Sequence, residues 1–129
     1  MLDTRFFIEH FFSSDPVTNA KTRKRLHSLR EGRKGILPSI VLAEIVNLVC
    51  QRRGRREAEQ RYQSMIASGL QIVEVRPEIA REAGLLKCKH RDVPFGDCIV
   101  ASSAIKLEAK IVSDDPHFGS IKGLKQSWL

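Results

Sequence analysis

The sequence lacks the features that identify several large classes of protein. No apolar run reaches the roughly 18 residues of a membrane-spanning helix, because Glu44 interrupts the strongest stretch, Ile40–Val49. Charged residues close behind Met1 leave no room for the apolar segment of a signal peptide. The three cysteines include no CxxC pair, which favours a reducing, cytoplasmic location over a disulfide framework.

Common catalytic motifs are also missing. The chain contains no GxxxxGKS/T phosphate loop, GxGxxG turn or GxSxG elbow, so nucleotide hydrolases of that type, dinucleotide enzymes and serine hydrolases are disfavoured. Its four histidines are scattered and no HExxH occurs, which disfavours zinc. Because no repeat or flexible linker divides the 129 residues, we expect one domain over residues 1–129.

Basic residues are in excess. The chain carries 22 Lys and Arg against 15 Asp and Glu, a formal net charge of +7. This excess suits a polyanionic partner, although it also serves solubility alone. The basic residues gather in three clusters, at 21–34, 52–61 and 87–91.

Alternating helices and short strands predict an α/β fold. The expected helices cover 6–12, 17–30, 39–53, 55–68, 77–89 and 97–108, and the expected strands cover 35–38, 70–75 and 110–113. Strands separated by helices imply a short parallel sheet flanked by helices on both faces. We expect Ser39 to cap the third helix. The aromatic side chains of the first helix either pack in the core or line a partner groove; they are Phe6, Phe7, Phe11 and Phe12.

Five acidic residues stand apart from the mixed charges of the surface. Asp3, Asp114 and Asp115 follow expected strands, Asp97 begins a helix, and Glu44 lies within an apolar helix. Each alone is explained by a cap, a turn or a solvated stripe. However, ligands of open parallel sheets bind at the carboxyl ends of the strands. Several carboxylates gathered there would repel one another unless a hard cation such as Mg²⁺ or Mn²⁺ lay among them.

Four blocks of residues resemble a known family in their order and spacing. The blocks are Asp3-Thr4, Ser39–Glu44, Gly96–Ala104 and Ser113–Phe118. They are similar to the PIN-domain nucleases, and specifically to the VapC-like toxin ribonucleases of type II toxin–antitoxin pairs. The resemblance extends from Asp3 to Phe118, nearly the whole chain.

The resemblance implies a metal-dependent endoribonuclease with a PIN-like fold. Asp3, Glu44, Asp97 and Asp115 would be its catalytic residues and would gather one or two Mg²⁺ or Mn²⁺ ions. A metal-activated water would then hydrolyse phosphodiester bonds of RNA.

Neighbouring side chains are expected to support these acids. Within the last block, the metal-site acid of the family stands two residues after Ser or Thr and three before Phe, which selects Asp115 and leaves Asp114 as an additional neighbour. We expect the hydroxyls of Thr4 and Ser113 to orient the carboxylates or a water.

The start of the chain departs from the family pattern in two ways. Only residues 1–2 precede Asp3, so either the first strand is short or the native start lies upstream. Arg5 stands where small polar residues are common in the family, and it is expected to alter the mouth of the site.

RNA, a small antitoxin and a second copy of the chain are the partners that the resemblance implies. Lys87, Lys89 and Arg91 precede Asp97 closely, and we expect them to contact the RNA backbone. Two alternatives remain open from the sequence: a stand-alone RNA-processing or quality-control nuclease of the same fold, and a non-catalytic RNA-binding module.

Overall fold

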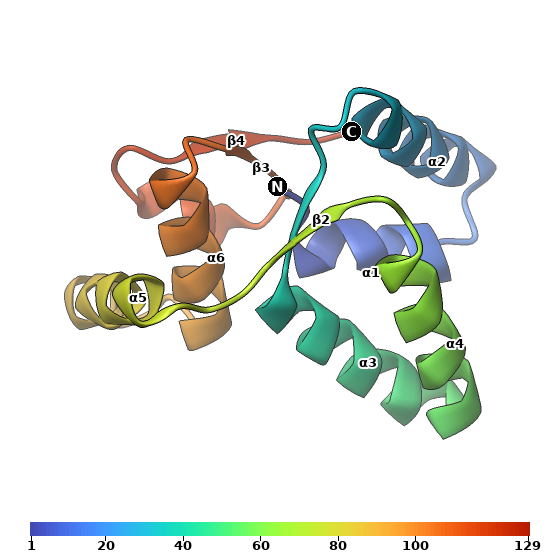
Figure 1. Ribbon diagram of the computed structural model, residues 1–129, viewed down its shortest axis with the longest axis horizontal. Coiled ribbons are helices and arrows are strands. Elements are labelled where there is room, and N and C mark those ends of the chain that lie inside the picture. Colours follow the sequence, from blue (N-terminus) through green and yellow to red (C-terminus); the bar gives the residue numbers. More distant parts are fainter.

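Six α-helices and four short strands make up the computed structural model, which describes residues 1–129 (Figure 1). The helices are α1 (Thr4–Phe12), α2 (Pro16–Glu31), α3 (Ser39–Arg53), α4 (Arg55–Ile66), α5 (Pro77–Lys89) and α6 (Phe95–Lys106). The strands are β1 (Ile36–Pro38), β2 (Gln71–Val73), β3 (Lys110–Val112) and β4 (Lys125–Ser127), and a 3₁₀ helix, η1 (Pro116–Ser120), follows β3. The predicted α/β class with short parallel strands is confirmed. None of the helices combines sufficient length and apolar character to span a bilayer.

The strands form two parallel pairs, and the first residues of the chain join them. β1 pairs with β2, and β3 pairs with β4. Between the pairs, the Leu2 amide donates to the Ile36 carbonyl at 2.9 Å, and the Val112 amide donates to the Met1 carbonyl at 2.8 Å. Leu2 also forms a parallel bridge with Val112. Asp3 therefore follows a central parallel segment, at the same edge where the chain leaves β3.

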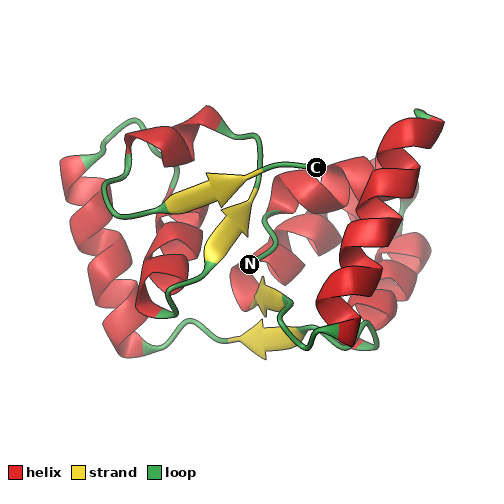
Figure 2. Ribbon diagram, turned by 90° about the horizontal axis from the view of Figure 1, so that it is seen from above, coloured by secondary structure: helices red, strands yellow, loops and turns green.

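Helices lie on both sides of the strands (Figure 2). On one side, α5 packs against α6; on the other lie α1 to α4, with α3 packed closely against α4. The core between them contains Leu2, Leu37, Ile45 and Ile111, which are all fully buried. Each strand is only three residues long, so packing of these apolar side chains contributes much of what holds the layers together.

The aromatic side chains of α1 belong to the core. Phe6 and Phe7 are buried, and Phe11 and Phe12 are partly buried against the same cluster. The outer faces of the latter two rings are covered by cations, because the Arg52 guanidinium lies 4.7 Å from the centre of the Phe12 ring and that of Arg61 lies 4.9 Å from the centre of the Phe11 ring. The core interpretation of this aromatic cluster therefore holds.

Several predicted boundaries are wrong in detail. Ser39 does not cap α3, since Pro38 occupies the N-cap position and no side chain caps the helix. α6 begins at Phe95 and not at Asp97, because Pro94, with its fixed backbone angle, occupies the N-cap position. The predicted ends at 68 and 108 come two residues earlier, at Ile66 and Lys106. The strand Lys125–Ser127 is not predicted, because its polar residues give no apolar alternation.

Candidate metal centre

A pocket of about 260 Å³, lined mostly by charged and polar residues, lies where α1, α3, α6 and the segment after β3 meet. Its lining residues are Asp3, Thr4, Arg5, Glu44, Pro94, Gly96, Asp97, Asp115 and His117. The structure thus brings into one pocket the four acids that the sequence places in four separate blocks.

Asp3 is the most deeply buried of the four acids, with 2% of its surface exposed. It is the N-cap residue of α1 and accepts a hydrogen bond from the Arg5 amide. Its Oδ2 also accepts from the Ser113 hydroxyl at 2.8 Å, and the oxygen of that hydroxyl accepts from the Asp115 amide at 3.1 Å. Burial raises the pKa of Asp3 above its ordinary value, and the hydrogen bond from Ser113 opposes this shift. The Ser113 hydroxyl therefore lies between Asp3 and the backbone of Asp115.

Glu44 reaches the pocket from the middle of α3. The Thr4 hydroxyl donates a hydrogen bond to its carboxylate. Burial raises the pKa of Glu44, opposed by this hydrogen bond. Asn47 and Gln51, which share a helix face with Glu44, hydrogen-bond to each other at the exposed surface. Only Glu44 of this polar stripe enters the pocket.

Asp97 and Asp115 complete the acidic lining. Asp97 lies in the first turn of α6, where the helix dipole favours negative charge. Burial, reinforced by the charges of Asp3 and Asp115, nevertheless raises the pKa of Asp97 to about 6. Asp115 is the N-cap residue of η1, and its Oδ1 accepts from the His117 amide at 2.9 Å.

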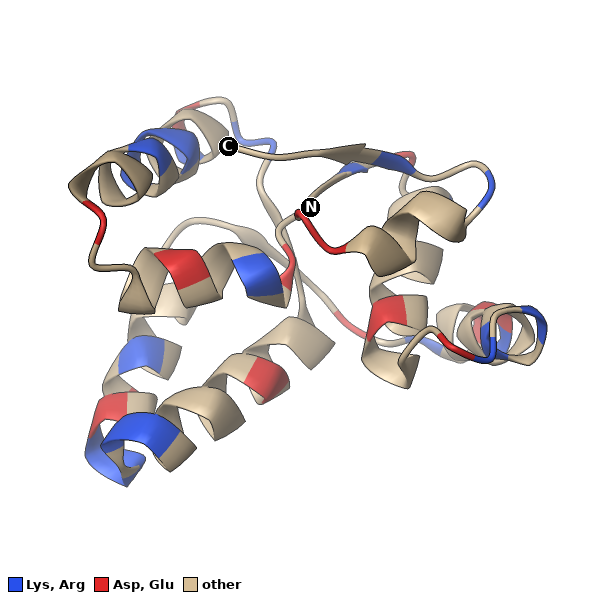
Figure 3. Ribbon diagram, turned by 180° about the vertical axis from the view of Figure 1, so that it is seen from behind, with Lys and Arg blue, Asp and Glu red and all other residues tan.

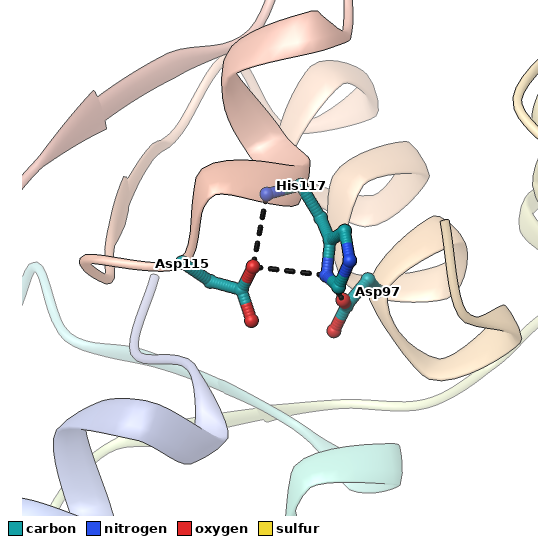
Figure 4. A group of neighbouring side chains, drawn as sticks. All are labelled: Asp97, Asp115 and His117. Atoms are coloured by element: carbon teal, nitrogen blue, oxygen red, sulfur yellow. Dashed lines mark hydrogen bonds and ion pairs between the residues drawn. The ribbon is translucent and has the colours of Figure 1, made fainter. Parts of the chain in front are cut away.

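His117 is a pocket residue that the sequence analysis misses. Its Nδ1 lies 3.1 Å from Asp97 Oδ2 and 2.9 Å from Asp115 Oδ1, so that the imidazole faces both carboxylates (Figure 4). The four histidines are scattered along the sequence, but η1 turns this one back to the site. The available signal is its position two residues after Asp115 in the same block.

Asp114 does not line the pocket. Its carboxylate faces the Arg5 guanidinium instead, with Arg5 Nε 2.9 Å from Oδ1 and a second nitrogen 3.3 Å from Oδ2. The hydrogen bond from Arg5 holds the pKa of Asp114 below its ordinary value. Asp114 therefore contacts the site only through Arg5.

The three basic residues expected to contact RNA differ in their contacts. The Lys87 ammonium donates to the carbonyls of Arg91 and Val93 at 2.7 and 2.8 Å, which holds the loop that leads into α6. The side chains of Lys89 and Arg91 are exposed and form no hydrogen bond or ion pair within the chain. They are available to an external anion, whereas Lys87 has a structural role.

A sequence model of the PIN domain matches residues 1–124. The chain belongs to the PIN domain family. This match includes all four acids of the pocket as well as His117. A comparison with curated proteins finds no match.

Solved structures with the same fold include several VapC proteins. VapBC2 from Rickettsia felis, bound to a DNA fragment from its promoter, has a TM-score of 0.79 and 21% identity, over 100% of this chain and 97% of that one. DNA-bound VapBC from Salmonella typhimurium has a TM-score of 0.81 and 17% identity, over 99% of this chain and 96% of that one. Mycobacterium tuberculosis VapC20, a sarcin–ricin loop cleaving toxin, has a TM-score of 0.71 and 19% identity, over 92% of both chains. At these identities the likeness shows that this PIN domain shares their fold.

The donor atoms of the pocket fit a small, hard divalent cation. They are carboxylate oxygens and one imidazole nitrogen, with no thiolate. Arg5 is the only Lys or Arg in the lining, and its guanidinium is paired with Asp114. Burial raises the pKa values of Asp3, Glu44 and Asp97, so the charged forms of these acids are disfavoured in the absence of an added positive charge. A divalent cation would supply that charge.

The pKa of Asp97 predicts a pH-dependent gain in stability for Asp97→Asn in EDTA. Because the pKa in the folded protein, about 6, is above the roughly 3.9 of an unfolded aspartate, ionisation of Asp97 destabilises the folded state increasingly from about pH 4 and fully above about pH 6. We expect Asp97→Asn to have the higher Tm at pH 7.5, and the difference to disappear below about pH 4. Thermal melts across this range test it, with the exposed Asp92→Asn as control. A lower Tm for Asp97→Asn at pH 7.5 would contradict the prediction.

Substitution of Gly96 by alanine tests whether the position of the Glu44 carboxylate matters for metal binding. A Cβ at residue 96 would overlap Glu44 Oε1, the end of a flexible side chain. We expect Gly96→Ala to displace that carboxylate and weaken Mn²⁺ binding about 10-fold or more, with little loss of stability. Calorimetric titration with Mn²⁺ and urea unfolding measure the two effects.

The matched control for this substitution is Gly84→Ala in α5, where an added Cβ meets nothing within 4 Å. It should leave the Mn²⁺ affinity unchanged and add about 0.5–1 kcal/mol of stability. Equal Mn²⁺ affinity of Gly96→Ala and the unsubstituted protein would contradict the prediction that the space beside Gly96 fixes the Glu44 carboxylate for metal binding.

Proposed function

We propose that this PIN domain, one domain over residues 1–129, is a metal-dependent endoribonuclease that hydrolyses RNA phosphodiester bonds. The observation that carries the proposal is the pocket formed by Asp3, Glu44, Asp97 and Asp115 within a chain of net charge +7. Lys and Arg occur along α2, α4 and α5, the outer helices (Figure 3). An acidic pocket in a basic body suits attraction of a polyanion and its cleavage at a metal. The shared fold with the loop-cleaving toxin VapC20 supports this activity.

In this proposal the four acids hold Mg²⁺ or Mn²⁺. When bound, such an ion activates water and stabilises the charge on the leaving oxygen. Ser113 and Thr4 fix the orientations of the Asp3 and Glu44 carboxylates through hydrogen bonds, so that these oxygens face the pocket before substrate arrives. Asp114 keeps Arg5 extended at the mouth of the pocket.

Lys89 and Arg91 are the proposed contacts for the RNA backbone. Both side chains are exposed. Arg91 belongs to the loop between α5 and α6, and Asp97 lies in the first turn of α6. Lys87 fixes the end of this loop through two carbonyls. The loop therefore couples the position of these cations to that of the metal-site acid.

The proposed biological role is that of a cytoplasmic toxin, held as a homodimer and inhibited by a small antitoxin. Two of the similar solved structures contain VapBC bound to DNA, which supports an antitoxin partner. If a small open reading frame that encodes an antitoxin lies beside the gene for this protein, the toxin role is favoured over that of a stand-alone processing nuclease.

Cleavage assays on labelled single-stranded and hairpin RNA test the activity. We expect cleavage with Mg²⁺ or Mn²⁺, none with EDTA, and a loss of about 100-fold or more in Asp97→Asn, because a metal ligand is removed. Glu59→Gln, an exposed acid on α4, is the control and should retain full activity. RNA binding without cleavage would overturn the proposed mechanism and favour a non-catalytic module. Cleavage that persists in EDTA would overturn the metal dependence of the mechanism.

The salt dependence of RNA binding tests the basic contacts. If Lys89 and Arg91 each neutralise one phosphate, replacing both with Ala should reduce the slope of log K against log salt by about 1.4 for single-stranded RNA. Fluorescence anisotropy at increasing KCl, with Mg²⁺ replaced by EDTA to prevent cleavage, measures this slope. Replacing Lys21 and Lys24 on α2 provides the control, and an unchanged slope for the first variant would remove Lys89 and Arg91 from the interface.

A further inference from the structure

We propose that His117 is a nitrogen ligand of the metal ion in the acid pocket, and that its imidazole makes the site prefer a first-row transition ion such as Mn²⁺ to Mg²⁺. The inference deepens the proposed function, because it takes the acid pocket to be a metal site. It adds a fifth donor to the four acids, and it makes a statement about which ion the site selects.

The donor atoms are spaced as metal ligands are. Nδ1 of His117 lies 2.9 Å from Asp115 Oδ1 and 3.1 Å from Asp97 Oδ2. In an octahedron with metal–ligand bonds of about 2.1 Å, neighbouring ligands lie roughly 3.0 Å apart. One oxygen from each acid and one ring nitrogen already lie within 4.8 Å of one another as a group. The nitrogen therefore lies at the separation of a neighbouring ligand from an oxygen of each acid, and all three donors are close enough to share one ion.

Hydrogen bonding alone cannot satisfy both carboxylates that face the His117 ring. Nδ1 carries at most one hydrogen, so the ring can donate to only one of the two carboxylates that it faces. The Asp115 Oδ1 atom, moreover, already accepts the backbone amide of His117. A cation among the three atoms would contact all of them at once, with the nitrogen lone pair directed to the metal.

Exposure favours a ligand role over a purely structural one. The side chain of His117 is 38% exposed, against 16% for Asp97 and 21% for Asp115. The imidazole thus forms the open rim of the pocket, where an ion enters and where exchange with water remains available.

The donor type decides the choice of ion. Mg²⁺ binds oxygen ligands and retains much of its water, whereas imidazole nitrogen binds transition ions well. A site with four carboxylates alone would show no marked preference of this kind. One neutral nitrogen among them shifts selectivity from Mg²⁺ toward the transition series.

Pulsed electron paramagnetic resonance of the full-length protein loaded with Mn²⁺ tests the inference directly, because a coordinated imidazole produces ¹⁴N modulation. We expect this modulation in the unsubstituted protein and its loss in His117→Asn. His27→Asn, an exposed histidine on α2, should leave it unchanged. In calorimetric titrations, His117→Asn should lower Mn²⁺ affinity about 10-fold while changing Mg²⁺ affinity much less.

The outcomes separate this inference from the proposed function. Mn²⁺ binding without ¹⁴N modulation, modulation that persists in His117→Asn, or no Mn²⁺ binding at all would overturn the assignment of His117. The first two results leave metal-dependent RNA cleavage intact. Conversely, ¹⁴N modulation in a protein that cleaves no RNA would support the ligand role while the nuclease proposal failed. If the variant is unstable, Mn²⁺ binding without ¹⁴N modulation in the unsubstituted protein still overturns the assignment.

Discussion

Repulsion among four carboxylates that share one small pocket is the constraint on which the rest of this structure depends. Two unit charges 4 Å apart near a protein surface repel by about 4 kcal/mol, while a whole domain is stable by only about 5–15 kcal/mol. Several such pairs cannot be tolerated in their charged forms without compensation. The fold meets this constraint by attaching each acid to a different element and by directing donors to it: a hydroxyl to Asp3, another to Glu44, and a backbone amide to Asp115.

The ion pair between Arg5 and Asp114 keeps the one nearby guanidinium from providing that compensation. Arg5 lines the pocket, and an arginine turned inward would neutralise one of the acids permanently. Asp114 instead holds the guanidinium at the exposed mouth, where both side chains are more than a third exposed. The negative charge inside the pocket is thus preserved for a partner from outside the protein. An exposed pair of this kind adds little stability, which suggests that its value lies in where it places the charge.

The sequence predicts the acids of the pocket better than their surroundings, for a physical reason. Asp3 and Asp115 follow short apolar segments, so parallel pairing alone brings them to one edge, and the four blocks supply Glu44 and Asp97. The pairing of Arg5 with Asp114 joins residues far apart in the chain and leaves no local pattern. His117 is not predicted because the 3₁₀ helix η1 directs it to the pocket, and the residues Pro116–Ser120 show no apolar period that would indicate this helix. Similarly, β4 is held by pairing with β3 and not by its own polar composition.

The hydrogen bond between Ser113 and Asp3 joins residues 110 positions apart. A ribosome makes the chain from one end to the other, so Asp3, Glu44 and Asp97 are all synthesised before the segment that holds Asp115 and His117 exists. A nascent chain therefore cannot assemble the acid pocket until the segment that holds Asp115 and His117 has emerged. If the pocket cleaves RNA as proposed, this order of assembly delays that activity until Asp115 and His117 have left the ribosome.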